Sequence, residues 1–440
     1  MDILIQATQF ILSLSLLIIL HEAGHFIPAK IFKTRVEKFY LFFDPWFSLF
    51  KKKIGDTEYG IGWLPLGGYV KIAGMIDESM DKEQMKKPAE PWEFRSKPAW
   101  QRLIIMIGGV TVNVILAIII YAGMMMYYGE EYLPVENVKY GITADSTAQA
   151  IGLRNGDRII EVDGTRIERF SQIPLEILLG DEGRIVLERD GEQMELFVSE
   201  TDKRDLIKAR SSLVGLRIPY VVGDFTDDSA AKQAGLQKGD SIVALNGEKM
   251  AYFDQYLEAI PEMAGENISL SVFREGEPLA VDMSVPESGK IGVYAMPPGS
   301  FFNFETKKYG PLEAIPAGLN KSFSVLGDYI RQFKLILNPE TEAYKEVGGF
   351  LMIAQQYGTQ WDWQRFWGFT AFLSIMLAFL NILPIPALDG GHVVFVLWEM
   401  ISGRKPSEKV LEYAQVAGFV ILMGLILLAN GNDILRLFQS

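Results

Sequence analysis

The sequence predicts a multi-span α-helical membrane protein with four transmembrane helices, a membrane-associated β-hairpin region and two β-rich domains outside the cytoplasm. Hydrophobic residues make up 49% of the 440-residue chain, and the mean hydropathy is +0.14, both high for a soluble protein. Four apolar stretches approach the ~20 residues needed to cross a bilayer core. Between the second and third stretches the chain changes to short alternating strands, glycine turns and an internal repeat.

The hydropathy pattern, the repeat and the composition shifts divide the chain into nine segments. They are 1–28, the first transmembrane helix; 29–100, a cytoplasmic loop with membrane-dipping hairpins; 101–128, the second transmembrane helix; 129–220 and 221–300, the two β-rich domains; 301–362, an amphipathic interfacial linker; 363–401, the third transmembrane helix; 408–431, the fourth; and 432–440, a tail on the outer side.

Composition excludes several classes of function. The chain has no cysteine, so it has no disulfide, thiolate zinc site or cysteine nucleophile. Its net charge of −13 argues against a nucleic-acid partner, because phosphate binding requires clustered basic surface. The N-terminus lacks a basic region and a small-residue cleavage site, so we expect the first apolar segment to be retained.

Lysine and arginine gather in two loops, which sets the predicted orientation. Such residues accumulate on the cytoplasmic side of membrane proteins. The basic residues that follow the first and third spans are Lys30, Lys33, Arg35, Lys38, Lys51, Lys52, Lys53, Arg404, Lys405 and Lys409. Both loops are therefore predicted to be cytoplasmic, and the two termini and the β-rich domains to lie outside.

A metal-binding pattern, H-E-x-x-H, closes the first span at His21 and His25. Residues four apart share one face of a helix, so both imidazoles can reach one zinc ion, with Glu22 beside them to take a proton from water. The chain has only three histidines, and two are in this motif. The alternative, two histidines buried in a helical core, would leave polar groups unpaired in an apolar helix at several kcal/mol each.

Asp389 is the candidate for the third ligand, because catalytic zinc usually has three protein ligands. It follows a span that Pro384 and Pro386 interrupt, and irregular backbone at membrane depth requires protein or a wet cavity around it. Taken alone, Asp389 reads as an ordinary turn residue. Its pairing with the motif in the first span favours the ligand role.

The region between the second and third spans contains two copies of the pattern G-L-x-x-G-D-x-I-x-x-x-(N/D)-G, within 150–164 and 233–247. The pattern resembles the PDZ domains of bacterial envelope proteases, which bind an extended peptide at a sheet edge. The alternative is a duplicated spacer that binds nothing. Three glycines match at a constant offset of 83: Gly152 with Gly235, Gly156 with Gly239, and Gly164 with Gly247.

Three further segments and the third histidine have no single assignment from the sequence. The glycine-rich stretch 59–74 reads as β-hairpins that dip into the membrane, or as an interfacial anchor. Gly109 and Asn113 in the second span favour close helix packing, with Asn113 near the site but not catalytic. The linker 301–362 reads as an interfacial amphipathic helix or as a plain connection. His392 is expected at the interface without a zinc role.

H-E-x-x-H in the first span together with N-x-x-P-x-P-x-L-D-G at 381–390 resembles the site-2 protease family of intramembrane metalloproteases. The resemblance covers essentially the whole chain. It implies that His21, His25 and Asp389 bind Zn²⁺, that Glu22 is the general base and that Asn381 holds the substrate or the developing oxyanion. It also implies that a glycine-rich loop holds the substrate as an added strand. The glycines of this loop are Gly60, Gly62, Gly67 and Gly68.

The resemblance implies a zinc endopeptidase of the bacterial inner membrane. It would act in regulated intramembrane proteolysis as part of a stress response. Its expected partners are the lipid bilayer, single-span membrane substrates and a PDZ peptide ligand. The substrates would be an anti-sigma factor after a first outer-side cut, or remnant signal peptides, with the PDZ pair as a size filter. Both termini and the PDZ-like domains would be periplasmic, and the active site near the cytoplasmic leaflet. The alternatives are a membrane PDZ scaffold with a structural zinc and a zinc transporter.

Overall fold

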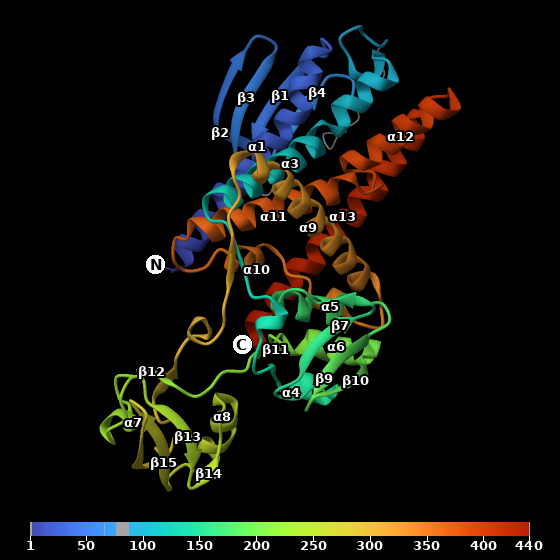
Figure 1. Cartoon of the computed structure of the whole chain (residues 1–440). Coiled ribbons are helices and arrows are strands. Elements are labelled where there is room, and N and C mark those ends of the chain that lie inside the picture. The colour runs from blue at the N-terminus through green and yellow to red at the C-terminus, as the bar shows by residue number, and fades with distance from the viewer. Residues whose placement is uncertain (1, 66, 76–87, 440) are drawn as a thin grey trace. The chain divides into compact units, whose positions relative to one another are not determined.

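The computed structural model describes residues 2–65, 67–75 and 88–439. The chain divides into a helical unit and a β-rich unit (Figure 1). The helical unit comprises 1–129, 308–334 and 344–440, and the β-rich unit comprises 130–307 and 335–343. Residue 66 and residues 76–87 of the predicted hairpin region lie outside the described residues.

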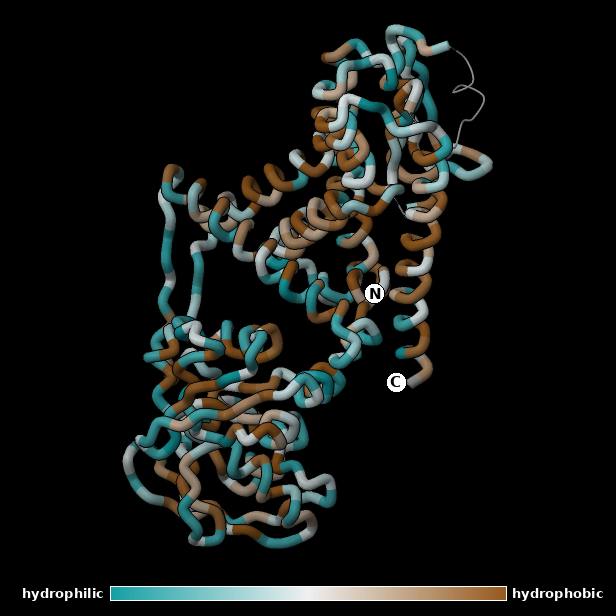
Figure 2. Tube along the Cα trace, turned by 90° about the vertical axis from the view of Figure 1, so that its right-hand side faces the viewer, coloured by the Kyte–Doolittle hydropathy of each residue, from teal (hydrophilic) through white to brown (hydrophobic). Residues whose placement is uncertain are grey.

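Four helices of the helical unit are long and apolar enough to cross a membrane, as the sequence predicts. Their apolar residues appear as long brown runs in Figure 2. They are α1 (Asp2–Ile31), α3 (Ala99–Tyr127), α11 (Trp363–Ile382) and α13 (Glu408–Gln439).

The predicted third span, 363–401, is two helices. α11 ends at Ile382, and α12 (Asp389–Ser402) begins after a turn that contains Pro384 and Pro386. Proline lacks a backbone N–H and fixes φ, so two prolines in three residues end the first helix. The break places Asp389, the first residue of α12, inside the helix bundle, where α12 packs against α3 and α11.

α3 packs against α1, α11 and α12 and forms the centre of this unit. Its contact with α1 brings the backbones of Gly108 and Gly24 together so closely that neither position has room for a Cβ. α9 (Pro311–Leu337) places Gly318 against the backbone of Ala122 in the same way. α10 (Phe350–Gln355) is tied to α13, because the Leu351 amide donates to Asp433 at 3.1 Å.

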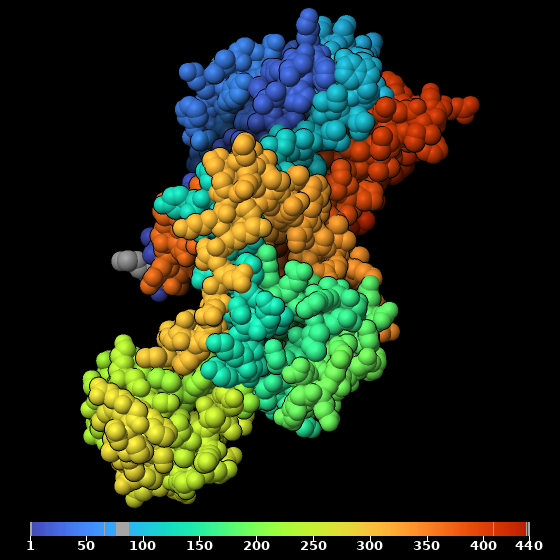
Figure 3. All heavy atoms as spheres, viewed as in Figure 1, coloured from blue at the N-terminus to red at the C-terminus, as the bar shows by residue number. Residues whose placement is uncertain are grey.

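The region after α1 is one mixed sheet rather than separate hairpins. Its strands are β1 (Val36–Leu41), β2 (Phe43–Ile54), β3 (Thr57–Leu64) and β4 (Tyr69–Ile72), in the order β2-β3-β1-β4. β1 and β3 are parallel, whereas the other neighbours are antiparallel. The segment before α3 joins this sheet, because the Phe94 N–H donates to Ala73 O at 2.8 Å. In Figure 3 the blue and cyan parts of the chain lie side by side. β4 is the end strand of this sheet.

The β-rich unit contains two domains with the same strand order. The first has the four-stranded sheet β10-β9-β7-β8 and the pair β11-β6, and the second has β16-β15-β13-β14 and the pair β12-β17. The first domain comprises β6 (Ile142–Ala144), α4 (Ser146–Ala150), β7 (Arg158–Val162), β8 (Thr165–Arg166), α5 (Ile173–Leu179), β9 (Arg184–Arg189), β10 (Glu192–Phe197), α6 (Glu200–Ala209) and β11 (Val214–Leu216). The second comprises β12 (Val222–Phe225), α7 (Ala230–Gln233), β13 (Ser241–Leu245), β14 (Glu248–Lys249), α8 (Phe253–Glu262), β15 (Asn267–Arg274), β16 (Glu277–Ser284) and β17 (Val293–Ala295). A further pair joins β5 (Glu130–Tyr132) to β18 (Glu305–Lys307).

The sequence repeat therefore corresponds to a repeated fold. All six matched glycines have positive φ, between 77° and 102°, which explains why glycine recurs at the turns. In the second domain Arg274 donates to both oxygens of buried Asp240, at 2.8 and 2.7 Å, and Arg189 makes the same pair of bonds to Asp157 in the first. Burial alone would raise the pKa of Asp240, but the Arg274 bonds outweigh it and lower that pKa.

Candidate metal centre

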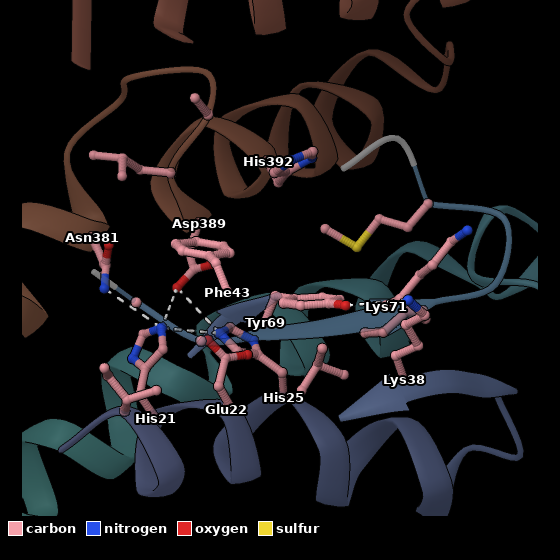
Figure 4. Close-up of a pocket in the computed structure, with 18 of the residues that line it drawn as sticks. His21, Glu22, His25, Lys38, Phe43, Tyr69, Lys71, Asn381, Asp389 and His392 are labelled. Carbon is pink, nitrogen blue, oxygen red and sulfur yellow. Dashed lines mark hydrogen bonds and ion pairs between the residues drawn. The ribbon is translucent and has the colours of Figure 1, made fainter. Parts of the chain in front are cut away.

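Three ligand-type side chains from two helices converge in the helical unit (Figure 4). His21 and His25 lie one turn apart on α1, and their Nε2 atoms are 3.3 Å apart. The Asp389 Oδ2 atom lies 3.3 Å from His21 Nε2 and 3.2 Å from His25 Nε2. The two ends of the sequence pattern, 364 residues apart in the chain (389 − 25), therefore meet in space.

The turn before α12 sets the position of Asp389. Asp389 is the first residue of α12, where the helix dipole favours a carboxylate. Gly390 and Gly391 follow because the backbones of Ile382 and Pro386 leave no room for a Cβ at either position. Ala387 has a φ of 123°, a strained conformation for a residue with a side chain, and such strain is common at functional sites.

The spacing of the three atoms fits a tetrahedral zinc site. Ligands about 2.0–2.1 Å from zinc in a tetrahedron lie about 3.3 Å from one another. The hydrogen-bond partners agree with this assignment. His25 Nδ1 lies 2.8 Å from the Ile105 carbonyl, which can only accept, so the proton is on Nδ1 and the lone pair on Nε2. In the neutral ring that lone pair faces the buried Asp389 Oδ2, for which the described residues supply no other hydrogen-bond donor, an arrangement that a cation between them would stabilise.

A cavity of about 740 Å³ opens onto these three residues. Glu22, beside them on α1, also lines it, and its side chain lies next to the start of β4, where a Cβ at Gly68 would be 3.6 Å from Glu22 Cγ. Asn381, at the end of α11, lines the cavity with its amide nitrogen 3.5 Å from His21 Nε2. The cavity therefore combines a metal-ligand set, a carboxylate and an amide that could bind a carbonyl group.

The structure separates the four loop glycines into two pairs. Gly67 and Gly68 line the cavity at the start of β4. Gly60 and Gly62 belong to β3, outside the cavity lining, where the Tyr40 ring and the Phe43 carbonyl occupy the space of a side chain. β3 reaches the cavity at Leu64, beyond the two glycines, so this second pair serves the packing of the sheet.

His392 also lines the cavity, but it is not part of the three-residue ligand group found among the described residues. In Figure 4 its ring lies on the far side of Asp389 from the two α1 histidines. The sequence predicts Asn113 near the site but does not indicate that α3 contacts those histidines directly, through the Ile105 carbonyl, Gly109 and Asn113. Their i, i+4, i+8 spacing could have indicated one helix face, although not its partner.

Comparison with known proteins places this geometry in a family. The model of peptidase family M50 matches residues 9–425. The regulator of sigma-E protease RseP of Escherichia coli K12 is 29% identical over 455 residues, covering 98% of each chain. Protease RseP of Yersinia pestis is 27% identical, covering 99% of this chain and all of its own. A Neisseria meningitidis protein named as a candidate zinc metalloprotease is 28% identical, covering 97% of this chain and 98% of its own.

These matches confirm the family resemblance seen in the sequence, and zinc is the cofactor they support. The chain belongs to peptidase family M50 and is a zinc metalloprotease of the site-2 type.

Proposed function

We propose that the chain is an intramembrane endopeptidase that cleaves single-span membrane proteins near the cytoplasmic face of the bacterial inner membrane. The observation that carries the proposal is the convergence of His21, His25 and Asp389 beside Glu22 in one cavity of a bundle of membrane-crossing helices. The basic loops after the first and third spans support the cytoplasmic placement. The direct test is cleavage of a single-span reporter by the wild type and by a Glu22→Gln variant.

His21, His25 and Asp389 would hold the zinc ion. Bound there, zinc would supply Lewis acidity, which makes a water molecule more acidic and polarises the scissile carbonyl. The Glu22 carboxylate would accept the proton of the attacking water as its oxygen bonds to the carbonyl carbon. Glu22 would then pass that proton to the amide nitrogen as the C–N bond breaks. Glu22 lines the same cavity as the three ligand-type side chains.

Asn381 would bind the substrate carbonyl. Its amide nitrogen faces the ligand cluster from the end of α11, and a donor in this place stabilises negative charge on the carbonyl oxygen. An alternative role, relief of the helix break before Pro384, does not require the amide to face the cavity. Its position in the cavity lining favours the substrate role.

The substrate would enter as an extended strand beside β4. A peptide bond inside a helix is not accessible to a nucleophile, so the substrate must unwind, and an unwound segment needs partners for its backbone groups. In the part of the chain that the structure describes, β4 is an end strand of the sheet, and Gly68 at its start lies beside Glu22, which places the outer edge of β4 next to the reacting groups. Gly68 permits this approach, because a Cβ there would collide with Ile18 of α1.

Disulfide trapping can test this strand addition, because the chain has no native cysteine. We expect Lys71→Cys on β4, combined with Glu22→Gln to retain the substrate, to crosslink to substrate cysteines at every second position, the period of a strand. Lys52→Cys on β2, at the opposite end of the sheet, is the matched control and should not crosslink. Equal crosslinking from both edges would contradict strand addition at β4.

The two repeated domains would act as a periplasmic size filter. Their shared topology and the PDZ-like glycine pattern support this assignment, and PDZ domains bind extended peptides by strand addition. Substrates would be single-span proteins already shortened on the outer side, such as an anti-sigma factor in a stress response, or remnant signal peptides. The relatives named regulator of sigma-E protease support the first class.

Deletion of residues 150–285 should allow cleavage of a substrate whose outer domain is intact, because the domains that would exclude it are removed. The measurement is cleavage of one reporter with and without its outer domain, by the full chain and by the deletion variant. Both proteins should cleave the shortened reporter, which shows that the deletion leaves the active site folded. Unchanged selectivity in the deletion variant would reject the filter.

A further inference from the structure

The helix α3 meets the two candidate zinc ligands of α1 through three positions on one face. The Ile105 carbonyl accepts from His25 Nδ1 at 2.8 Å. One turn later, Gly109 lies under both imidazole rings, where a Cβ would be 2.6 Å from His21 Cε1. One further turn along, the side-chain amide of Asn113 lies against His21, with its nitrogen 3.2 Å from Nδ1. Each histidine therefore has its Nε2 toward Asp389 and its Nδ1 toward α3.

Burial and a hydrogen bond to its backbone hold Asn113 in this place. It is fully buried, and the Ser374 hydroxyl of α11 donates to its backbone carbonyl at 2.7 Å. The Oδ1 atom of its amide has no hydrogen-bond partner among the described residues. Within the same residues, His21 is therefore the only side chain to which the amide is hydrogen-bonded. A buried polar side chain in an apolar helix has an energetic cost, and helix packing alone would be served better by an apolar residue.

The protonation of His21 decides which end of the amide faces the ring. The oxygen and nitrogen of an amide have nearly the same shape, so the hydrogen-bond partner determines their assignment. His21 Nε2 converges with the other two ligand atoms, and a neutral imidazole with a lone pair on Nε2 has its proton on Nδ1. A protonated Nδ1 requires an acceptor. A half-turn of the amide gives it one, the Asn113 oxygen.

We propose that Asn113 is a positioning residue for the zinc site, whose amide oxygen accepts the Nδ1 proton of His21 and thereby directs His21 Nε2 toward the metal. This inference rests on the proposed ligand set. Asn113 would act on His21 as the Ile105 carbonyl acts on His25, so one helix would fix the tautomer and the ring orientation of both histidines. Partners of this kind typically change metal affinity by about 10- to 100-fold when they are removed.

Zinc affinity of the full-length chain in detergent, measured by competition with a chromophoric chelator, tests the proposal without reference to activity. We expect Asn113→Leu, which keeps the approximate shape but has no acceptor, to weaken zinc binding about 10- to 100-fold. Asn113→Asp keeps an acceptor and should hold zinc within a few-fold of the wild type. Thr111→Val is the matched control, because the one partner of the Thr111 hydroxyl among the described residues is the Ile107 carbonyl of its own helix.

The Leu and Asp variants separate the proposed role from packing and from the reverse amide orientation. Equal loss of zinc in both variants would overturn the proposal, because an amide that donates to Nδ1 cannot be replaced by a carboxylate. Wild-type affinity in Asn113→Leu would also overturn it. His21→Ala distinguishes failure of the ligand set: if that variant keeps full zinc affinity, the proposed site itself is wrong.

Nitrogen-15 NMR of the histidine rings gives a second readout, because the chain has only three histidines. With zinc bound, the His21 ring should be the Nδ1–H tautomer in the wild type and in Asn113→Asp. In Asn113→Leu the His21 signals should broaden or show both tautomers, whereas those of His25 stay unchanged. An Nε2–H tautomer of His21 in the zinc-loaded wild type would contradict the proposal.

Discussion

The Glu22→Gln variant should bind zinc as the wild type does and should cleave a single-span reporter about 10²- to 10⁴-fold more slowly, the usual contribution of a general base. Glutamine keeps the size of the side chain and can still pair with its surroundings, but it cannot accept the proton of the attacking water. Glu22 supplies none of the three ligand atoms that converge, so the metal site should remain intact.

The measurement is zinc content and reporter cleavage in the same purified samples. This pairing discriminates between an enzyme and a membrane scaffold with a structural zinc, because a structural site has no use for a carboxylate beside its ligands. Wild-type cleavage by Glu22→Gln would reject the catalytic role. Loss of zinc together with activity would show instead that Glu22 is part of the metal site.

The Gly109→Ala substitution should weaken zinc binding by about 10- to 100-fold, with an equal or greater loss of cleavage. A methyl group at Gly109 would overlap the His25 ring at Nε2, the proposed ligand atom, and would press on His21 as well. The rings can avoid it only by leaving the positions in which their Nε2 atoms meet Asp389. The added group also overpacks a buried contact, which typically costs about 1–3 kcal/mol of stability.

Gly123→Ala in the same helix provides the matched control. Apart from its own helical turn, a Cβ at Gly123 would meet no atom of the described residues within 4 Å, so this variant tests alanine in α3 without the steric effect. It should keep wild-type zinc binding and, by the greater helix propensity of alanine, gain stability of about 0.5–1 kcal/mol. Zinc affinity is measured by chelator competition for both variants. Equal affinity of Gly109→Ala and the wild type would show that the rings have another stable arrangement.

The sequence predicted those parts of the site that depend on local spacing. H-E-x-x-H places two imidazoles on one helix face, and the proline pair before Asp389 predicts a broken span. Both features are present, and the two segments meet. The matched glycines likewise predicted two domains of one topology, because positive φ at fixed intervals is a local requirement.

Features that depend on which helix lies beside which were not accessible in this way. The sequence predicts Asn113 in a helix contact near the site, but nothing in its own segment shows that His21 is its neighbour. The mixed order of the sheet, with β1 between β3 and β4, is also a long-range property. The four glycines of the one loop likewise separate into a pair in the cavity and a pair that packs inside the sheet, which their spacing alone does not indicate.

X-ray absorption at the zinc edge of the purified protein tests the central claim most directly, because it reports the ligands themselves. The proposed site predicts nitrogen and oxygen ligands at about 2.0–2.2 Å, with the multiple scattering of two imidazoles. Asp389→Ala should remove one oxygen ligand, and His392→Ala should leave the spectrum unchanged. A third imidazole that disappears in His392→Ala, or a spectrum unaffected by Asp389→Ala, would contradict a site built from His21, His25 and Asp389.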